Sequence, residues 1–207
     1  MGPILLRGVP PALWCRPIGS HFGPEYAGEV TESVLRTAHT SELTAAELRA
    51  ARALLDEAFD GDFSDQDWDH GLGGVHALVH DAGGALVAHG SVVQRRILHH
   101  GRSLRVGYVE AVAVRTDRRR QGLGGRVMGA LERVVDGAYD LGALSASAEG
   151  ERLYLGRGWT RWQGAVGTLG PTGAVLMPEE DPPLLRGAAR LDPAYELLID
   201  WREGDVF

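Results

Sequence analysis

The sequence predicts one α/β domain built on a mixed, mostly antiparallel sheet with helices on both faces. Its 207 residues are 44% hydrophobic and 24% charged, which suits a single filled core and leaves too little chain for two full domains. Three strand-like segments follow one another between residues 75 and 115. One helical pattern precedes them and another follows, so the sheet can be covered on either side.

The N-terminal residues lack such patterns. Residues 1–29 show neither a helical nor a strand period and hold several glycines and prolines, so we expect a disordered arm before a domain at residues 30–207. Their apolar run is interrupted by Arg7 and is too short for a signal peptide. No stretch of about 18 apolar residues occurs, so no membrane span and no membrane partner are expected.

The first helix is predicted over residues 44–58, because Thr44 and Glu47 form the pattern of a capping box. Apolar residues follow at helical spacing. We expect an acidic loop next, with aspartates Asp60, Asp62, Asp65, Asp67 and Asp69. Such loops are more often solvated than functional, and this one lacks the distal glutamate of a calcium loop, so no metal is expected.

Three strands are expected at residues 75–80, 85–98 and 104–115, with turns at residues 83–84 and 100–102. The third contains VGYVEAVAV, which is apolar nearly throughout, as in a central strand covered on both faces. Glu110 is the exception in this run. A carboxylate there costs several kcal/mol unless it is paired or functional, so Glu110 is a candidate catalytic residue.

Several histidines in this region invite a metal or catalytic-triad interpretation; they are His70, His76, His80, His89, His99 and His100. Alternation along the strands should point them to different faces. No spacing such as HExxH occurs among them. We therefore interpret them as structural or surface residues.

After the third strand, the loop TDRRRQGLGG opens a second helix, whose inward positions include Val127 and Leu131. Free N–H groups and the helix dipole at such a start attract an anion, and glycine lets a phosphate approach the backbone. The spacing is not GxGxxG and no P-loop lysine is present, which disfavours dinucleotide and nucleotide folds. A solvated arginine run before a glycine-rich helix start is an equal alternative on spacing alone.

Composition narrows the chemistry further. The chain has no lysine, which excludes Schiff-base, pyridoxal and kinase mechanisms. Cys15 is the only cysteine, so no disulfide framework exists and a cytoplasmic location is expected. The net charge of -7 disfavours nucleic acid and favours a cationic partner.

The loop RRQGLG, residues 119–124, resembles the pyrophosphate loop of the GNAT N-acetyltransferase superfamily. As in that superfamily, it follows a central strand and precedes a helix, a strand at residues 143–147, a short helix at 149–155 and a GW turn. YLGRGW is similar to the tyrosine helix that closes many members. The resemblance implies a GNAT-like fold with acetyl-CoA as co-substrate.

A second resemblance is more specific and covers residues 30–207. GDFSDQDWDHGLGGVHALV, VVQRRI, RVGYVEAVAVR, YDLGALSASA, RLYLGRGW and DWREGDVF together are similar to the aminoglycoside 2'-N-acetyltransferases. This implies acetyl transfer to the 2'-amine of an aminoglycoside antibiotic, and hence resistance. It leaves open whether the protein forms a homodimer.

The second resemblance also implies roles for single residues. Glu110 matches the catalytic carboxylate, which acts on the amine through water, and Tyr154 matches the general acid beside the thioester sulfur. The acyl-CoA contacts would be Val112, Ala113, Val114, Arg119, Arg120, Gln121, Gly122, Leu123 and Gly124. The aminoglycoside contacts would be Asp62, Asp67, Glu110, Ala111, Ser145, Glu180, Asp205 and Phe207.

The chemistry of the reaction agrees with these roles. An amine must lose a proton before it attacks a thioester, so a base has to lie within reach. The oxyanion calls for N–H donors from a strand splayed after Glu110, and a polycation calls for carboxylates. Without a cysteine or lysine nucleophile, direct attack in a ternary complex is expected. Tyr154 on an amphipathic helix could instead be a half-buried core residue.

Two positions depart from the family pattern. Ala111 stands where glycine is expected, and Phe207 stands where tryptophan is expected. These changes bear on the choice of aminoglycoside more than on the reaction. Two rival functions stay open: acetylation of another polycationic amine, such as a polyamine or a cell-wall precursor, and drug binding by a relative without turnover.

Overall fold

The computed structural model describes residues 33–207, so the predicted arm at residues 1–29 lies outside the described residues. The strands are β1 (Val34–His39), β2 (Val75–His80), β3 (Leu86–His99), β4 (Arg102–Val114), β5 (Leu141–Leu144), β6 (Thr160–Arg161), β7 (Val166–Gly170), β8 (Gly173–Leu176), β9 (Leu184–Arg186) and β10 (Leu197–Asp200). The helices are α1 (Ala45–Ala58), α2 (Asp65–His70), α3 (Leu123–Ala138) and α4 (Glu151–Leu155), with 3-10 turns at Thr40–Glu42 and Thr116–Arg118.

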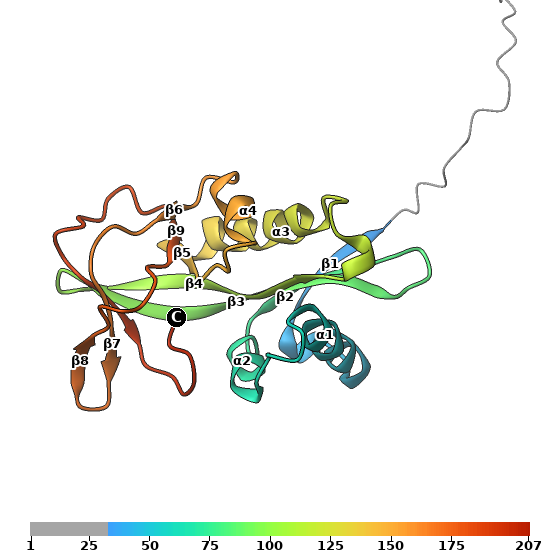
Figure 1. Ribbon diagram of the computed structural model, residues 1–207, viewed down its shortest axis with the longest axis horizontal. Coiled ribbons are helices and arrows are strands. Elements are labelled where there is room, and N and C mark those ends of the chain that lie inside the picture. Colours follow the sequence, from blue (N-terminus) through green and yellow to red (C-terminus); the bar gives the residue numbers. More distant parts are fainter. Residues whose placement is uncertain (1–32) are drawn as a thin grey trace, which may run out of the picture. The chain divides into compact units, whose positions relative to one another are not determined.

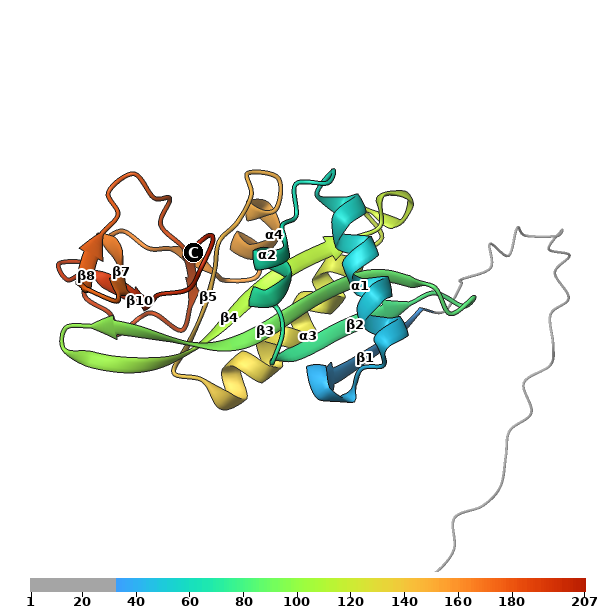
Figure 2. The ribbon, with the colours of Figure 1, turned by 90° about the horizontal axis from the view of Figure 1, so that it is seen from below.

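The strands form one mixed sheet in the order β6-β9-β5-β4-β3-β10-β7-β8, and β2 joins β1 to β3. Neighbouring strands are antiparallel except for the pairs β4–β5 and β7–β10. α3 and α4 lie on one face of the sheet, and α1 and α2 lie on the other (Figure 1, Figure 2). The predicted fold class is confirmed.

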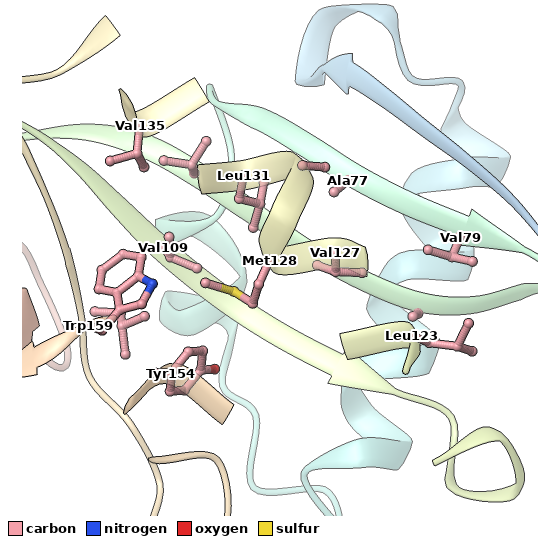
Figure 3. Packing of buried hydrophobic residues seen from close by; sticks show 14 of the residues in the cluster. Ala77, Val79, Val109, Leu123, Val127, Met128, Leu131, Val135, Tyr154 and Trp159 are labelled. Carbon is pink, nitrogen blue, oxygen red and sulfur yellow. The ribbon is translucent and has the colours of Figure 1, made fainter. Parts of the chain in front are cut away.

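The main core lies between the sheet and α3. Val127, Met128 and Leu131 of α3 are fully buried against β2, β3 and β4, and Trp159 closes one end (Figure 3). The indole Nε1 of Trp159 donates to Glu132 at 2.9 Å, and Arg157 pairs with the same carboxylate at 2.5 Å. This buried carboxylate therefore has its partners, as burial demands.

A β-bulge interrupts β4 in the middle of the sheet. Ser91 pairs with Glu110 and His89 pairs with Ala113, so Ala111 and Val112 together oppose Gly90 alone. Ala111 has a φ of 50°, in the left-handed region. Gly90 has to be glycine, because a Cβ there would come within 2.8 Å of Val127.

The strands β4 and β5 part close to this bulge. Their parallel pairing runs from Val106 to Tyr108 on β4 and stops before Glu110. The backbone of β4 beyond Glu110 is therefore free of β5. This is the splayed geometry that acetyl transfer was expected to need.

Most predicted elements are confirmed within two residues. The first helix has Thr44 as its N-cap with the capping box formed, and the three strands of the meander lie where expected. The predicted strand at residues 143–147 was misplaced, because it ends at Leu144 and leaves Ser145 outside. The short helix begins at Glu151 rather than at residue 149.

The acidic segment is not a continuous loop, which corrects the prediction. Residues Asp65–His70 form α2, and Ser64 caps it by accepting from the N–H of Asp67 at 3.1 Å. The carboxylate of Asp67 accepts in return from Ser64. The pattern Ser-x-x-Asp is a capping signature that could have indicated this helix.

Candidate active site

The first cavity, of about 460 Å³, lies between β4, the loop before α3 and α4. It is lined by every predicted acyl-CoA contact except Gln121, and also by Tyr154. Gln121 is exposed and turns to the backbone carbonyl of Asp117, 3.4 Å away. The structure thus brings together a group of residues that the resemblance assigned to one ligand.

The loop before α3 is shaped to receive an anion. Arg120 and Gly122 have φ values of 60° and 77°, and Gly122 is the N-cap of α3. No side chain from residues 33–207 caps the helix, and among these residues its first N–H groups are open to a ligand. A Cβ at Gly122 would meet nothing within 4 Å, so the approach to these groups is clear.

The arginines of this region divide into two sets. Arg115 and Arg118 are held by Asp81 and Asp117. Within residues 33–207, Arg119 and Arg120 make no ion pair, and both line the cavity. Their charge adds to the helix dipole at the same place.

Tyr154 lies on the α4 wall of this cavity, against Val109 and Met128 of the core (Figure 3). Its side chain is buried, and burial raises the pKa of its hydroxyl to about 12. The phenol, which is protonated at neutral pH even with an ordinary pKa, stays so here. A protonated hydroxyl on the cavity wall can donate to a leaving group.

Glu110 lies on the other face of the sheet, beside α2 and the C-terminal segment. Its carboxylate pairs with Arg202, whose Nη1 lies 2.5 Å from Oε1, and both side chains are less than one-sixth exposed. Ser91 lies opposite Glu110 in the neighbouring strand. Its hydroxyl is the one buried side-chain polar atom without a partner among the described residues.

Arg95 and Arg202, which together we call the arginine clamp, hold the C-terminal segment beside Glu110. Arg95 is buried and donates to the carboxylate of Asp200 at 2.9 Å and to the carbonyl of Val206 at 2.5 Å. The guanidinium carbons of Arg95 and Arg202 lie 5.1 and 5.5 Å from the centre of the Tyr108 ring. Stacking of this kind stabilises a cation against a desolvated ring.

Three of the predicted aminoglycoside contacts gather around this clamp. Tyr108 forms a hydrogen bond of 3.0 Å with Ser145, and Phe207 is buried in the same cluster as Tyr108. The backbone carbonyl of Asp205 accepts from Arg202 at 2.8 Å. The sequence drew attention to none of Arg95, Arg202 and Tyr108, although the matched segments VVQRRI, RVGYVEAVAVR and DWREGDVF contain them.

Glu180 joins the acids at this end of the molecule. Burial raises the pKa of its carboxyl above the ordinary value, and the nearby charges of Asp205 and Asp181 raise it further. The charges of two carboxylates predicted from distant parts of the chain, Glu180 and Asp205, therefore act on each other. A bound cation would relieve their repulsion.

The other predicted acids are placed differently. Asp62 is exposed in the turn after α1, and the carboxylate of Asp67 is engaged in the α2 cap. A cavity of about 450 Å³ between α2 and the C-terminal segment is lined by Asp65, Gln66, Asp69, His70, Trp201, Arg202 and Glu203. Arg202 thus faces this second cavity and Glu110 alike.

The histidines do not all follow the predicted alternation. His76 and His89 lie on the same face of the sheet and form a hydrogen bond of 2.9 Å, because β2 and β3 pair in a register that puts them side by side. Both are buried, as is His99. In the described part of the chain, no cluster of three or more His, Cys, Asp or Glu suits a metal ion. Helices long and apolar enough to cross a membrane are likewise not found between residues 33 and 207.

Comparison with known proteins gives a family match and a highly similar relative. Residues 39–161 match the acetyltransferase (GNAT) domain family. The chain is 48% identical over 192 residues to an aminoglycoside 2'-N-acetyltransferase of Mycolicibacterium fortuitum. That match covers 88% of this chain and 98% of the relative.

Solved structures share the fold. The GNAT family N-acetyltransferase YhbS from Escherichia coli, in complex with CoA, matches with a TM-score of 0.58 and 15% identity, over 89% of this chain and 94% of that one. An acyl-CoA N-acyltransferase from Pseudomonas aeruginosa matches with a TM-score of 0.54 and 19% identity, over 75% and 99% of the two chains. At these identities the likeness shows the fold alone.

Proposed function

The chain belongs to the GNAT acetyltransferases and, within them, to the aminoglycoside 2'-N-acetyltransferase family, and on that premise we propose that it transfers the acetyl group of acetyl-CoA to the 2'-amine of an aminoglycoside. The observation that carries this proposal is the arrangement around β4. The first cavity, whose lining suits an anion, borders Val112–Val114, and the carboxylate of Glu110 pairs with Arg202, which lines the acidic second cavity. The bulge at Ala111 and Val112 directly follows Glu110, and Val112 lines the first cavity.

The donor side suits acetyl-CoA, which supplies an acetyl group activated as a thioester. The open N–H groups of α3, together with Arg119 and Arg120, suit the charge of its pyrophosphate. The backbone of Val112–Val114, free of β5, suits the acyl-CoA chain. N–H groups there can also stabilise the oxyanion that forms as the amine attacks.

On the acceptor side, Glu110 is proposed to take the proton of the substrate amine through water. Its carboxylate is paired with Arg202, so an incoming ammonium competes with this guanidinium for Glu110. Arg202 also faces the acid-lined cavity, where the substrate's other ammonium groups would lie. The side chain of Arg202 therefore couples binding of the aminoglycoside to exposure of the Glu110 carboxylate.

Tyr154 is proposed to hydrogen-bond the departing thiolate and to protonate it. A tyrosine hydroxyl is protonated at neutral pH, and burial, which raises the pKa of Tyr154 to about 12, does not change this. Because Tyr154 and Val112–Val114 line the same cavity, the leaving group and the oxyanion site share one compartment. The amine then attacks directly, in a ternary complex.

Carboxylates supply the affinity for a polycation in this proposal. Glu180 and Asp205 are close enough for repulsion to raise the pKa of Glu180, and Asp65, Asp69 and Glu203 line the second cavity. Asp62, Asp67 and Phe207 stay proposed contacts. We further propose a cytoplasmic enzyme that confers resistance and forms a homodimer, which size-exclusion chromatography with light scattering would test.

Mass spectrometry of tobramycin and kanamycin A after incubation with protein and acetyl-CoA tests the proposed function. Tobramycin carries a 2'-amine and kanamycin A a 2'-hydroxyl, so tobramycin alone should gain one acetyl group. Acetylation of both drugs would show that an amine other than the 2'-amine is acetylated. Turnover of spermidine but of neither drug would favour the rival polyamine function, and binding without turnover would favour a sequestering protein.

A further inference from the structure

A chain of hydrogen bonds crosses the sheet beneath α1 and ends at the bulge. Thr40 Oγ1 accepts from the N–H of Gly73 at 2.9 Å and lies 2.8 Å from His76 Nε2. His76 Nδ1 lies 2.9 Å from His89 Nε2. His89 Nδ1 lies 3.3 Å from the carbonyl oxygen of Ala111. Both imidazoles are buried, with no more than 1% of either residue exposed.

The chemistry of the last contact sets the tautomers of both rings. A carbonyl only accepts, so His89 Nδ1 must carry the proton and His89 Nε2 must be bare. His76 Nδ1 then donates to His89 Nε2, which leaves His76 Nε2 bare in its turn. The single proton of the Thr40 hydroxyl then goes to that nitrogen, 2.8 Å away, rather than to the carbonyl of Gly74, 3.2 Å away. The donors therefore all run in one direction, from Thr40 towards Ala111.

The charge state of the pair agrees with this order. Burial lowers the pKa of His76 to about 4, and the nearby His39 lowers it further. Burial lowers the pKa of His89 to about 3, and His76 adds to that effect. Both rings are therefore neutral at physiological pH and keep a single N–H each.

The carbonyl of Ala111 needs this bond. The bulge takes Ala111 out of the regular β3–β4 ladder, and a half-buried carbonyl that lacks a donor is destabilising. Ala111 is also held at a φ of 50°, which is strained for a residue with a side chain. Glu110 precedes it directly and Val112 follows it, so its conformation sets the relation between the two halves of the site.

We propose that His76 and His89 are positioning residues that lock the Ala111 carbonyl and so hold Glu110 and the acyl-CoA strand, Val112–Val114, in register for acetyl transfer. This inference rests on the proposed function for its catalytic consequence. Neither histidine lines the first or the second cavity. They act through one backbone carbonyl in the middle of β4.

Two replacements of His89 separate positioning from packing. The amide nitrogen of asparagine can take the place of Nδ1, so His89→Asn keeps the donor to Ala111 but leaves a small cavity. The amide of glutamine takes the place of Nε2, so His89→Gln fills the site better but loses that donor. We expect kcat to fall by roughly 10- to 100-fold in His89→Gln, the scale of a small misplacement, and far less in His89→Asn. The midpoint of thermal unfolding should be higher for His89→Gln than for His89→Asn.

His99 offers a matched control for this experiment. It is a buried histidine of the same strand, and both its nitrogens also bond to the backbone, at Glu196 and Asp192. It lies at the far end of β3 from the bulge. His99→Gln should lower stability and leave kcat and both KM values as in the wild type. A fall in its kcat equal to that of His89→Gln would overturn the positioning role.

Two measurements that do not depend on turnover test this inference independently of the proposed function. Nitrogen-15 NMR of the wild-type imidazoles should show both His76 and His89 as neutral Nδ1–H tautomers. Hydrogen exchange of residues 110–114 should be faster in His89→Gln than in His89→Asn. An Nε2–H tautomer on His89, or equal exchange in the two variants, would overturn the inference. Failure of the wild type to acetylate any amine would overturn the proposed function instead.

Discussion

Ala111 occupies a backbone conformation that favours glycine, which explains why the family resemblance leads one to expect glycine there. Its φ of 50° costs a residue with a Cβ about 1–2 kcal/mol relative to the right-handed regions. The bulge nevertheless forms, because the strands on either side and His89 hold it. Strain kept at one residue next to Glu110 is typical of a functional site.

The strain at Ala111 leads to a stability prediction. Ala111→Gly should leave the free energy of unfolding unchanged or raise it by up to about 1 kcal/mol, since relief of strain outweighs the added freedom of the unfolded chain. Ala113→Gly is the matched control, because Ala113 is buried in β4 without a positive φ. It should lower stability by about 1–2 kcal/mol. Urea denaturation of both variants would measure this, and equal losses would contradict the explanation.

A second prediction for a single residue concerns Glu110. Glu110→Gln removes the proposed base and should lower kcat by about 10²–10⁴-fold, the usual range for general acid–base groups. Glu132→Gln is the control, because Glu132 is an equally buried carboxylate paired with an arginine at 2.5 Å. It should lose stability and keep its turnover. Steady-state assays at saturating substrates compare the two, and near-normal kcat in Glu110→Gln would remove that residue from the mechanism.

Among the elements, α3 contributes most to the proposed donor site. Its inward side chains fill the main core, and its open N-terminus faces the first cavity. The same helix thus anchors the sheet and presents N–H groups to an anion. The loop that feeds it depends on two left-handed residues, Arg120 and Gly122.

Gly122→Val should raise the KM for acetyl-CoA. A β-branched residue at a φ of 77° is strained by about 1–2 kcal/mol, which corresponds to roughly a 5- to 30-fold loss of affinity if the loop leaves its binding conformation. The KM for the amine should stay near the wild-type value. Gly137→Ala, at the solvent-exposed end of α3, is the control and should change neither constant. Unchanged acetyl-CoA kinetics in Gly122→Val would place the pyrophosphate elsewhere.

At the scale of the whole molecule, the buried histidine pair makes stability depend on pH. In the unfolded chain both histidines have ordinary pKa values near 6.5, whereas in the folded protein the pKa is about 4 for His76 and about 3 for His89. Below pH 6.5 the unfolded state therefore binds more protons than the folded state. Stability is fully present above that pH and declines as the pH falls towards 4 and below.

Urea denaturation at pH 7.5, 6.0 and 5.0 would measure this decline. Each histidine contributes a slope of up to about 1.4 kcal/mol per pH unit. The range from pH 6.5 to 5 lies above the titration of ordinary carboxyl groups, and comparison with His89→Gln separates His89 from Glu180, whose pKa is raised. In His89→Gln one of the two titrations is lost, and the slope should fall by about half. An unchanged slope in that variant would show that His89 does not titrate in this way.

Much of the fold and part of the site could be predicted from the sequence. Capping residues, hydrophobic period and turn glycines act within a few residues, and so α1, β2, β3, β4 and α3 lie where they were expected. The resemblance proposed the acyl-CoA contacts, and their grouping was predictable because a strand, a loop and a helix start are consecutive in the chain. All of them but Gln121 line one cavity.

Local sequence by itself therefore determined the secondary elements of the meander, the open start of α3 and the carboxylate at position 110. Only the tertiary structure decided what that carboxylate meets. Arg202 lies 92 residues away in the chain and reaches Glu110 because β10 pairs with β3 and carries the C-terminal segment back across the sheet. The pairing of His76 with His89 and the bulge at Ala111 likewise depend on strand register. Register is set by the packing of whole faces of the sheet, and no short stretch of sequence contains it.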